Sequence, residues 1–215
     1  EQDVFYISTN TRSLTERECR ETLCSLVKSL ERAATNANKE LSLVLRSDST
    51  LRGHFDAEIE SVVETSGTKI DGILFVPVFF EGGRFTFESE HYVLIGNRLV
   101  KAENTEFAQD PSFGFCSSYL PKYIEEKTGG RVRASEVQRI LLNDIREGGT
   151  ERVSRIFRSL NQTTFVVADA LNYADLEVLV LGLLDAERKG KKFLYRTAGS
   201  FVKVRAGIED KELVD

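Results

Sequence analysis

Short apolar runs alternate with longer amphipathic stretches along most of the chain. The apolar runs predict strands at 3–7, 41–45, 72–78, 140–142, 163–168 and 193–195. Apolar residues at helical spacing predict helices at 15–34, from 55 to 63, from 117 or 118 to 127, at 150–160 and at 173–188. Repeated strand–helix units of this length favour an α/β fold, in which a mainly parallel sheet is flanked by helices and joined by right-handed crossovers.

One segment breaks this alternation. After the turn at 81–84, the runs 85–87, 91–95 and 98–100 have the length and pattern of short antiparallel strands, with a tight turn at Gly96-Asn97. We therefore expect a small antiparallel hairpin excursion around residues 85–103.

Composition narrows the class of protein. With 215 residues, 41% of them hydrophobic, the chain can bury one sizeable core, so residues 1–215 fit one domain or one domain plus a small lobe. The net charge of -5 and the lack of a long basic run argue against a nucleic-acid partner. No apolar run reaches the roughly 18 residues of a membrane span. The 3 Cys lack metal-type spacing and read as reduced thiols, which favours a cytoplasmic protein.

Four polar clusters follow predicted strands, and a fifth candidate, Asp169, ends another. Because the carboxyl ends of parallel strands lie along one edge of a sheet, these clusters can share one site. The densest is the strand-to-helix turn that follows Arg46, which holds a carboxylate, hydroxyls and a guanidinium group. The clusters are Asn10-Thr11-Arg12, Asp48-Ser49-Thr50-Leu51-Arg52, Gly82-Gly83-Arg84 and Thr197-Ala198-Gly199-Ser200.

Each cluster also has a local explanation that the sequence leaves open. The hydroxyls and carboxylate at 48–50 are common in helix caps and turns, as are the residues at 10–12. Gly82 and Gly83 can form a loop with positive φ beside a solvent-facing Arg84, and Gly199-Ser200 can simply begin the last helix. Asp169 can cap the helix that follows it. His54 and His91 have no second ligand at metal-site spacing, so no metal site is predicted.

Familiar nucleotide and hydrolase motifs are missing from the sequence. There is no G-x-x-x-x-G-K-[ST] loop, no G-x-G-x-x-G, no H-E-x-x-H and no G-x-S-x-G. The chain is therefore not expected to be a self-sufficient kinase or dehydrogenase of standard type.

A series of motifs resembles the N-terminal, substrate-binding domain of the four-carbon acid sugar kinase family, formerly a domain of unknown function. The motifs keep their order in the family and span nearly the whole chain. They are Asp48-Ser49-Thr50-Leu51-Arg52-Gly53, Val76-Pro77 leading into Glu81-Gly82-Gly83-Arg84, Thr105-Glu106-Phe107-Ala108-Gln109-Asp110-Pro111, Asp169-Ala170 and Ala198-Gly199-Ser200.

The resemblance implies the substrate-binding part of an ATP-dependent kinase that phosphorylates a hydroxyl of a four-carbon sugar acid such as threonate or erythronate. The family's Ala-Asp-Asp-x-Thr-Gly turn is missing, and its C-terminal nucleotide-binding domain would begin where this sequence stops. We therefore expect a fragment of a two-domain polypeptide that is inactive alone, with ATP and Mg²⁺ held mainly by the other domain. The His54 position often carries Asn in the family.

A sugar acid needs cationic donors for its carboxylate and polar partners for its hydroxyls. Under the resemblance, Asp48 is the candidate catalytic group, which orients the attacking hydroxyl or accepts its proton. Arginines grip a carboxylate with two parallel hydrogen bonds. The predicted substrate-binding residues are Asn10, Arg12, Arg46, Ser49, Thr50, Arg52, Gly82, Gly83, Arg84, Asp169, Gly199 and Ser200.

Two other function classes stay open. The same pocket would suit a non-catalytic module that binds a carboxylated metabolite or a partner domain. An isomerase or aldolase-like lobe acting on similar sugars is the third candidate. In each case the expected small-molecule partner is an acid, and neither a membrane nor a nucleic acid is expected as a partner. The hairpin excursion is a candidate interface for a homo-oligomer.

Overall fold

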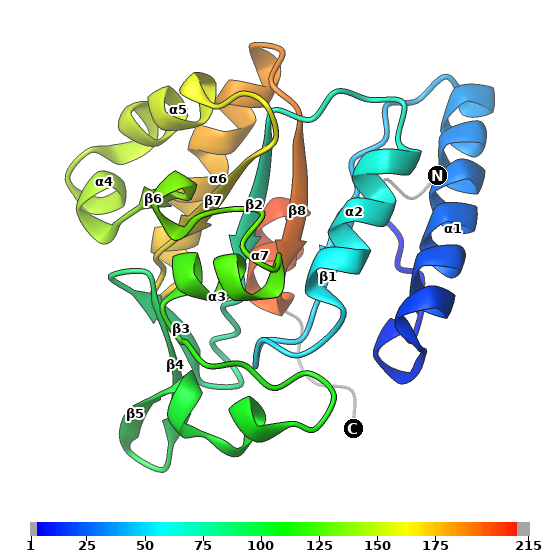
Figure 1. The fold of residues 1–215 in the computed structure, drawn as a ribbon. Helices are drawn as coiled ribbons and strands as arrows, with labels where there is room; N and C mark the ends of the chain where they lie inside the picture. Colours follow the sequence, from blue (N-terminus) through cyan, green and yellow to red (C-terminus); the bar gives the residue numbers. More distant parts are fainter. Residues whose placement is uncertain (1–3, 210–215) are drawn as a thin grey trace.

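A five-stranded parallel sheet forms the centre of the computed structural model, which describes residues 4–209 (Figure 1). Its strands are β1 (Val44–Arg46), β2 (Gly72–Val76), β6 (Gln138–Ile140), β7 (Thr164–Ala168) and β8 (Phe193–Thr197). Their order is β1-β8-β2-β7-β6, and every neighbouring pair is parallel. The predicted α/β fold with a mainly parallel sheet is confirmed.

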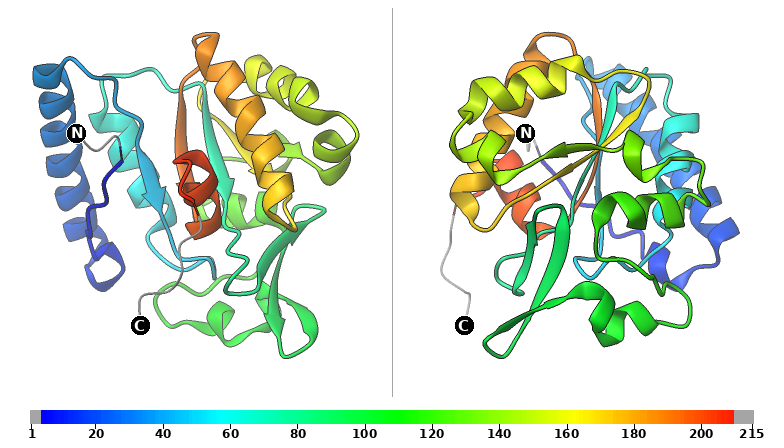
Figure 2. Two further views of the ribbon diagram at one scale, coloured as in Figure 1. Left: turned by 180° about the vertical axis from the view of Figure 1, so that it is seen from behind. Right: turned by 60° about the vertical axis from the view of Figure 1, so that its left-hand side comes forward.

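Helices cover both faces of this sheet, as Figures 1 and 2 show. On one face lie α1 (Glu16–Ala37), α2 (Phe55–Thr65) and α3 (Leu120–Lys127), and on the other lie α4 (Leu142–Arg146), α5 (Gly149–Ser159), α6 (Tyr173–Arg188) and α7 (Gly199–Arg205). Because successive side chains of a strand point to opposite faces of the sheet, the core is divided into two clusters, one under each layer of helices. In β2, Ile73 and Phe75 join the first cluster, whereas Leu74 and Val76 join the second.

A second sheet lies beyond the carboxyl-terminal edge of the parallel one (Figure 1). It contains the antiparallel strands β3 (Arg84–Phe87), β4 (Glu90–Ile95) and β5 (Arg98–Lys101), in the order β3-β4-β5. The predicted hairpin excursion is therefore confirmed. Four short 3-10 helices complete the described elements: η1 (Thr11–Ser13), η2 (Ala102–Asn104), η3 (Glu106–Gln109) and η4 (Ala134–Glu136).

Several strand predictions differ from the structure. The run at 72–78 is a strand only to Val76, and the strand predicted at 193–195 continues to Thr197. Residues 4–7 of the expected strand at 3–7 have no regular structure and stay exposed, and position 3 lies outside the described residues. The strand expected at 41–45 spans only Val44–Arg46, because pairing with β8 begins at Val44. The run 140–142 is a strand only to Ile140, since the Asp144 carboxylate accepts the Leu141 N–H at 3.1 Å and begins a helix there.

Within residues 4–209, every helix is too short or too polar to cross a bilayer.

Candidate functional site

A pocket of about 750 Å³ opens at the carboxyl ends of β1 and β8. Ligands of open α/β sheets bind at this edge. Three segments far apart in the sequence form its walls: residues 6–12, the β1 end with the turn after it, and the start of α7. Of the predicted site residues, the pocket brings together Asn10, Arg12, Arg46, Asp48, Ser49, Arg52 and Gly199.

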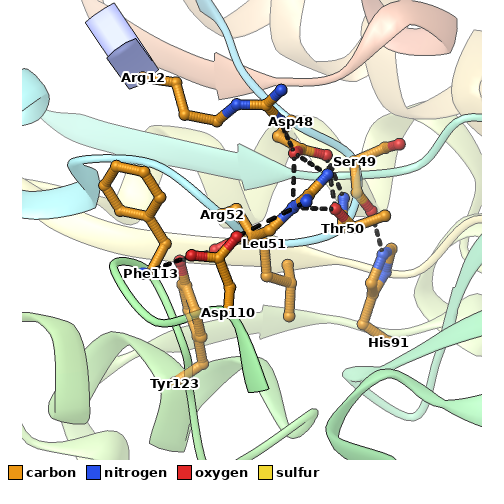
Figure 3. A network of polar contacts seen from close by, with 10 residues as sticks. All are labelled: Arg12, Asp48, Ser49, Thr50, Leu51, Arg52, His91, Asp110, Phe113 and Tyr123. Atoms are coloured by element: carbon orange, nitrogen blue, oxygen red, sulfur yellow. Dashed lines mark hydrogen bonds and ion pairs between the residues drawn. The ribbon is translucent and has the colours of Figure 1, made fainter. Parts of the chain in front are cut away.

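Asp48 is the centre of the polar network in Figure 3. Its Oδ1 accepts hydrogen bonds from the backbone N–H and the hydroxyl of Thr50, at 2.8 and 2.7 Å. Its Oδ2 accepts from Arg12 Nη1 at 2.5 Å and from Arg52 Nε at 3.0 Å. Burial raises the pKa of Asp48, but these hydrogen bonds and the charges of Arg52 and Arg12 outweigh it, so the pKa lies below its ordinary value.

This geometry bears on the role of Asp48. Both carboxylate oxygens are already occupied, and a lowered pKa makes the group a weak base. What the carboxylate does in the structure is hold the guanidinium groups of Arg12 and Arg52 at the pocket. Asp48 does not cap a helix, because α2 begins only after His54. Its bond to the Thr50 N–H instead forms an Asx turn, which is the other local explanation. The catalytic role of Asp48 stays a prediction.

Arg52 links this network to a neighbouring loop. Its Nη1 lies 3.6 Å from the Asp110 carboxylate, and its guanidinium group sits 5.0 Å from the centre of the Phe107 ring. Both residues belong to the 105–111 motif, which the sequence analysis noted only as a family resemblance. η3 and the residue after it therefore support the site from outside the pocket lining.

Arg46 differs from the other arginines of the pocket. It is exposed and lines the pocket, and its side chain has no ion pair or hydrogen bond within residues 4–209. Gly199 lies beside it: a Cβ on that glycine would make an ordinary contact with Arg46 Nη2 at 3.8 Å and a tight one with the Phe79 ring at 3.3 Å. Arg46 thus presents an unbalanced positive charge at the pocket.

A buried ion pair at the pocket was not among the residues predicted from the sequence. Arg196 of β8 and Glu58 of α2 form a hydrogen-bonded pair, with side chains only 3% and 10% exposed. Thr11 Oγ1 donates a further hydrogen bond to Glu58 at 2.7 Å. Part of the signal was available, because an arginine directly after the apolar run 193–195 requires a counter-charge if it is buried, and Glu58 lies among the apolar residues of the helix predicted at 55–63.

Arg84 and its two glycines lie outside the pocket lining. The Arg84 guanidinium group donates to the Gly82 carbonyl and lies 5.8 Å from the Phe107 ring centre, so it shares that ring with Arg52. A Cβ on Gly82 would meet the Phe79 ring at 2.5 Å, and Gly83 has φ +73 in the tight turn before β3. Gly83 therefore has the positive φ of the local explanation, whereas Gly82 does not, and Arg84 is partly buried rather than solvent-facing.

Three other predicted residues are also structural in their observed contacts. Thr50 is 3% exposed and bonds to Asp48. Ser200 is buried, and its hydroxyl accepts the Phe80 N–H at 3.0 Å. Asp169 is fully buried outside the pocket. The structure does not bring these side chains to the pocket.

Asp169 instead joins the two sheets. Its carboxylate accepts the N–H groups of Glu88, Ser89 and Leu142, at 3.0, 2.8 and 3.3 Å. Glu88 and Ser89 both have positive φ, which is unusual for residues with a Cβ. The two hydrogen bonds offset the strain of this turn between β3 and β4.

Comparison with known proteins agrees with the fold. A family model for the sugar-binding N-terminal domain matches residues 1–205. The chain belongs to this family. A search of curated proteins gave no match to the sugar-binding domain.

Solved structures similar to the sugar-binding domain come from several bacteria. A Haemophilus influenzae protein of family DUF1537 has 17% identity and a TM-score of 0.71, with 93% of this chain and 44% of that chain covered. A Bordetella bronchiseptica DUF1537 protein, a domain-swapped dimer with bound citrate, has 23% identity and a TM-score of 0.68, with 93% and 44% covered. A Salmonella typhimurium protein provisionally described as a tRNA synthase has 20% identity and a TM-score of 0.69, with 93% and 43% covered.

These findings confirm the resemblance to the N-terminal domain of the four-carbon acid sugar kinase family. The chain spans less than half the length of the three solved chains. Between residues 4 and 209, no cluster of three or more His, Cys, Asp or Glu side chains could hold a metal ion.

Proposed function

We propose that this sugar-binding domain is the substrate-binding part of an ATP-dependent kinase that phosphorylates a hydroxyl of a four-carbon sugar acid of the threonate or erythronate type. The observation that carries the proposal is the unpaired guanidinium group of Arg46 in a pocket whose other charged groups are paired. The paired groups are Arg12 and Arg52 with Asp48 and Asp110, and Arg196 with Glu58.

The charge count favours a ligand with one carboxylate. Four arginines and two carboxylates, Asp48 and Glu58, line the pocket, and Asp110 beside it adds a third carboxylate through its ion pair with Arg52. One positive charge is then left, at Arg46. The ligand's hydroxyl groups would find Ser49 and Asn10, which line the pocket and whose side chains have no hydrogen-bond partner in the described part of the chain. Citrate in the Bordetella bronchiseptica relative is itself a hydroxylated carboxylic acid, which supports this ligand class.

The proposed reaction requires ATP and Mg²⁺, but residues 4–209 offer no binding site for either. The sequence has no phosphate-binding loop, and residues 4–209 have no metal-ligand cluster, so the groups present do not fit a Mg²⁺–ATP site. We therefore place both on the nucleotide-binding domain of the same polypeptide. The part of this chain is to hold the acid and to orient its hydroxyl group.

Two rival functions stand beside the kinase. A non-catalytic module that binds a carboxylated metabolite would use the same pocket, and the activity of the polypeptide with its nucleotide-binding domain separates the two. A role on tRNA, as in the name of the Salmonella typhimurium relative, conflicts with a net charge of -5, because phosphate backbones require a cationic surface.

The first prediction concerns Arg46. D-threonate at millimolar concentration should raise the melting temperature of the wild-type chain, and Arg46→Gln should weaken its affinity roughly 10- to 100-fold. The reason is that one charge-assisted hydrogen bond contributes about 1.5–3 kcal/mol, and about 1.4 kcal/mol is a factor of ten. Isothermal titration calorimetry measures the change.

Arg17→Gln is the matched control, since Arg17 is exposed on α1 and forms only a long 3.8 Å ion pair. It should bind like the wild type. Failure of every four-carbon aldonate to bind the wild-type chain would contradict the proposal. For the kinase activity itself, the polypeptide with its nucleotide-binding domain should release ADP only when an aldonate is present, whereas a non-catalytic module would release none.

A further inference from the structure

We propose that the segment 84–127, which is inserted between two strands of the parallel sheet, sets the shape of the acid-binding turn 48–52 through two positioning residues, His91 and Tyr123. Each donates a buried hydrogen bond to a backbone carbonyl of that turn (Figure 3). The inference rests on the proposed function for its ligand, but the contacts themselves do not depend on that function.

The turn has a conformation that requires support. Leu51 has φ 68, in the left-handed region that residues with a Cβ seldom adopt, and it is only 2% exposed. Such a residue costs of order 1 kcal/mol and persists only where surrounding contacts fix it. The side chains that the turn presents to the pocket, Asp48 and Arg52, lie on either side of it.

Tyr123 of α3 supplies the first contact. Its hydroxyl donates to the Leu51 carbonyl at 2.6 Å, and the side chain is fully buried. The ring is held edge-on to Phe55 at 5.2 Å and stacked on Phe75 at 5.7 Å, so the hydroxyl has little freedom to move. The carbonyl of the strained residue is therefore fixed by the core.

His91 of β4 supplies the second contact. Its Nε2 lies 2.8 Å from the Ser49 carbonyl, and its Nδ1 lies 3.1 Å from Thr86 Oγ1. Because a carbonyl only accepts, Nε2 carries the proton, and the neutral ring then accepts the Thr86 hydroxyl at Nδ1. The ring is fully buried, so it links β3, β4 and the turn without a charge.

Together the two donors fix alternate carbonyls of a five-residue turn. With the Ser49 and Leu51 carbonyls held, the Thr50 N–H stays directed at Asp48 Oδ1, and that carboxylate in turn holds Arg52. Neither His91 nor Tyr123 lines the pocket. The antiparallel sheet and α3 thus act on ligand binding through the backbone of the turn.

Tyr123→Phe tests the inference by removing a single oxygen. We expect the affinity for D-threonate to fall about fivefold, measured by calorimetry well below the melting temperature, and the amides of Thr50 and Leu51 to exchange hydrogen faster. Tyr195→Phe is the matched control, because Tyr195 is as deeply buried and its hydroxyl bonds to Glu187, away from the pocket. That variant should leave the affinity and both amides unchanged.

A second pair of variants covers His91. His91→Leu should weaken binding as Tyr123→Phe does, whereas His91→Gln, which keeps a donor, should recover part of the affinity. Equal effects of Tyr123→Phe and Tyr195→Phe on affinity and on exchange would overturn the inference, because a general loss of stability would then suffice. If the wild type binds no aldonate, the proposed function fails, and the exchange of Thr50 and Leu51 alone decides the positioning role.

Discussion

Glu58→Gln should lower the free energy of unfolding by about 3–5 kcal/mol, the range found when one partner of a buried ion pair is removed. The substitution keeps the shape of the side chain and the acceptor for Thr11 but leaves the Arg196 guanidinium group without its counter-charge. That group is 3% exposed, so water cannot replace the lost carboxylate. Urea unfolding followed by circular dichroism measures the change.

Two further variants separate the buried charge from other causes. The double variant Glu58→Met with Arg196→Met should recover most of the loss, since no charge then remains buried. Glu151→Gln, in an exposed pair with Arg155, should change stability by less than about 1 kcal/mol. The explanation is wrong if Glu58→Gln is as mild as Glu151→Gln.

As the pH falls from 6.5 to about 4, the contribution of His91 to the free energy of unfolding should decrease by about 3 kcal/mol. Burial is the largest cause that lowers the pKa of His91, from 6.5 to about 4. Between these values the unfolded chain binds a proton at His91 that the folded chain does not bind. This stability is therefore complete above pH 6.5 and is lost as the pH falls toward 4.

Asp169 acts in the opposite direction in the same range. Burial outweighs its three backbone hydrogen bonds and raises its pKa from 3.8 to about 6. The folded chain then keeps a proton that the unfolded chain releases, so Asp169 adds stability as the pH falls from 6 toward 3.8. The stability of the wild type therefore changes less with pH than the contribution of His91 or of Asp169 taken alone.

Variants separate the two contributions. The stability of His91→Gln should fall less steeply than that of the wild type between pH 6.5 and 4, and that of Asp169→Asn should fall more steeply. Each profile comes from urea unfolding at fixed ionic strength, and slopes rather than absolute stabilities are compared. Parallel profiles for His91→Gln and the wild type would show that His91 does not titrate in this way.

Much of the fold followed from the sequence because strong local patterns agreed with the tertiary structure. The continuous apolar run at 72–78 and the helical periodicity at 173–188 match β2 and α6. The run at 4–7 did not form a strand, because a strand requires a neighbour and an apolar run carries no information about one. The Glu88-Ser89 turn was equally invisible, since its support comes from Asp169, about 80 residues away.

The candidate site was predictable in part for a similar reason. Polar residues directly after parallel strands converge whatever their identity, which is why Arg46, Asp48 and Gly199 meet. Position after a strand does not show whether a side chain faces the pocket at the carboxyl-terminal edge of the sheet. Asp169 and Ser200 follow strands but are buried. The Arg196–Glu58 pair was missed because strand pattern gives the face of a residue but not the partner opposite it.

The pairing of β1 with β8 has a consequence for folding kinetics. The Ser47 N–H donates to the Thr197 carbonyl at 2.7 Å, a contact between residues 150 positions apart. Contacts between residues so far apart in the sequence form late in folding, because the entropy cost of closing a long loop comes before the contact can stabilise the chain. During synthesis, the pocket at the ends of β1 and β8 would thus form only after β8 had left the ribosome, about 150 residues after β1.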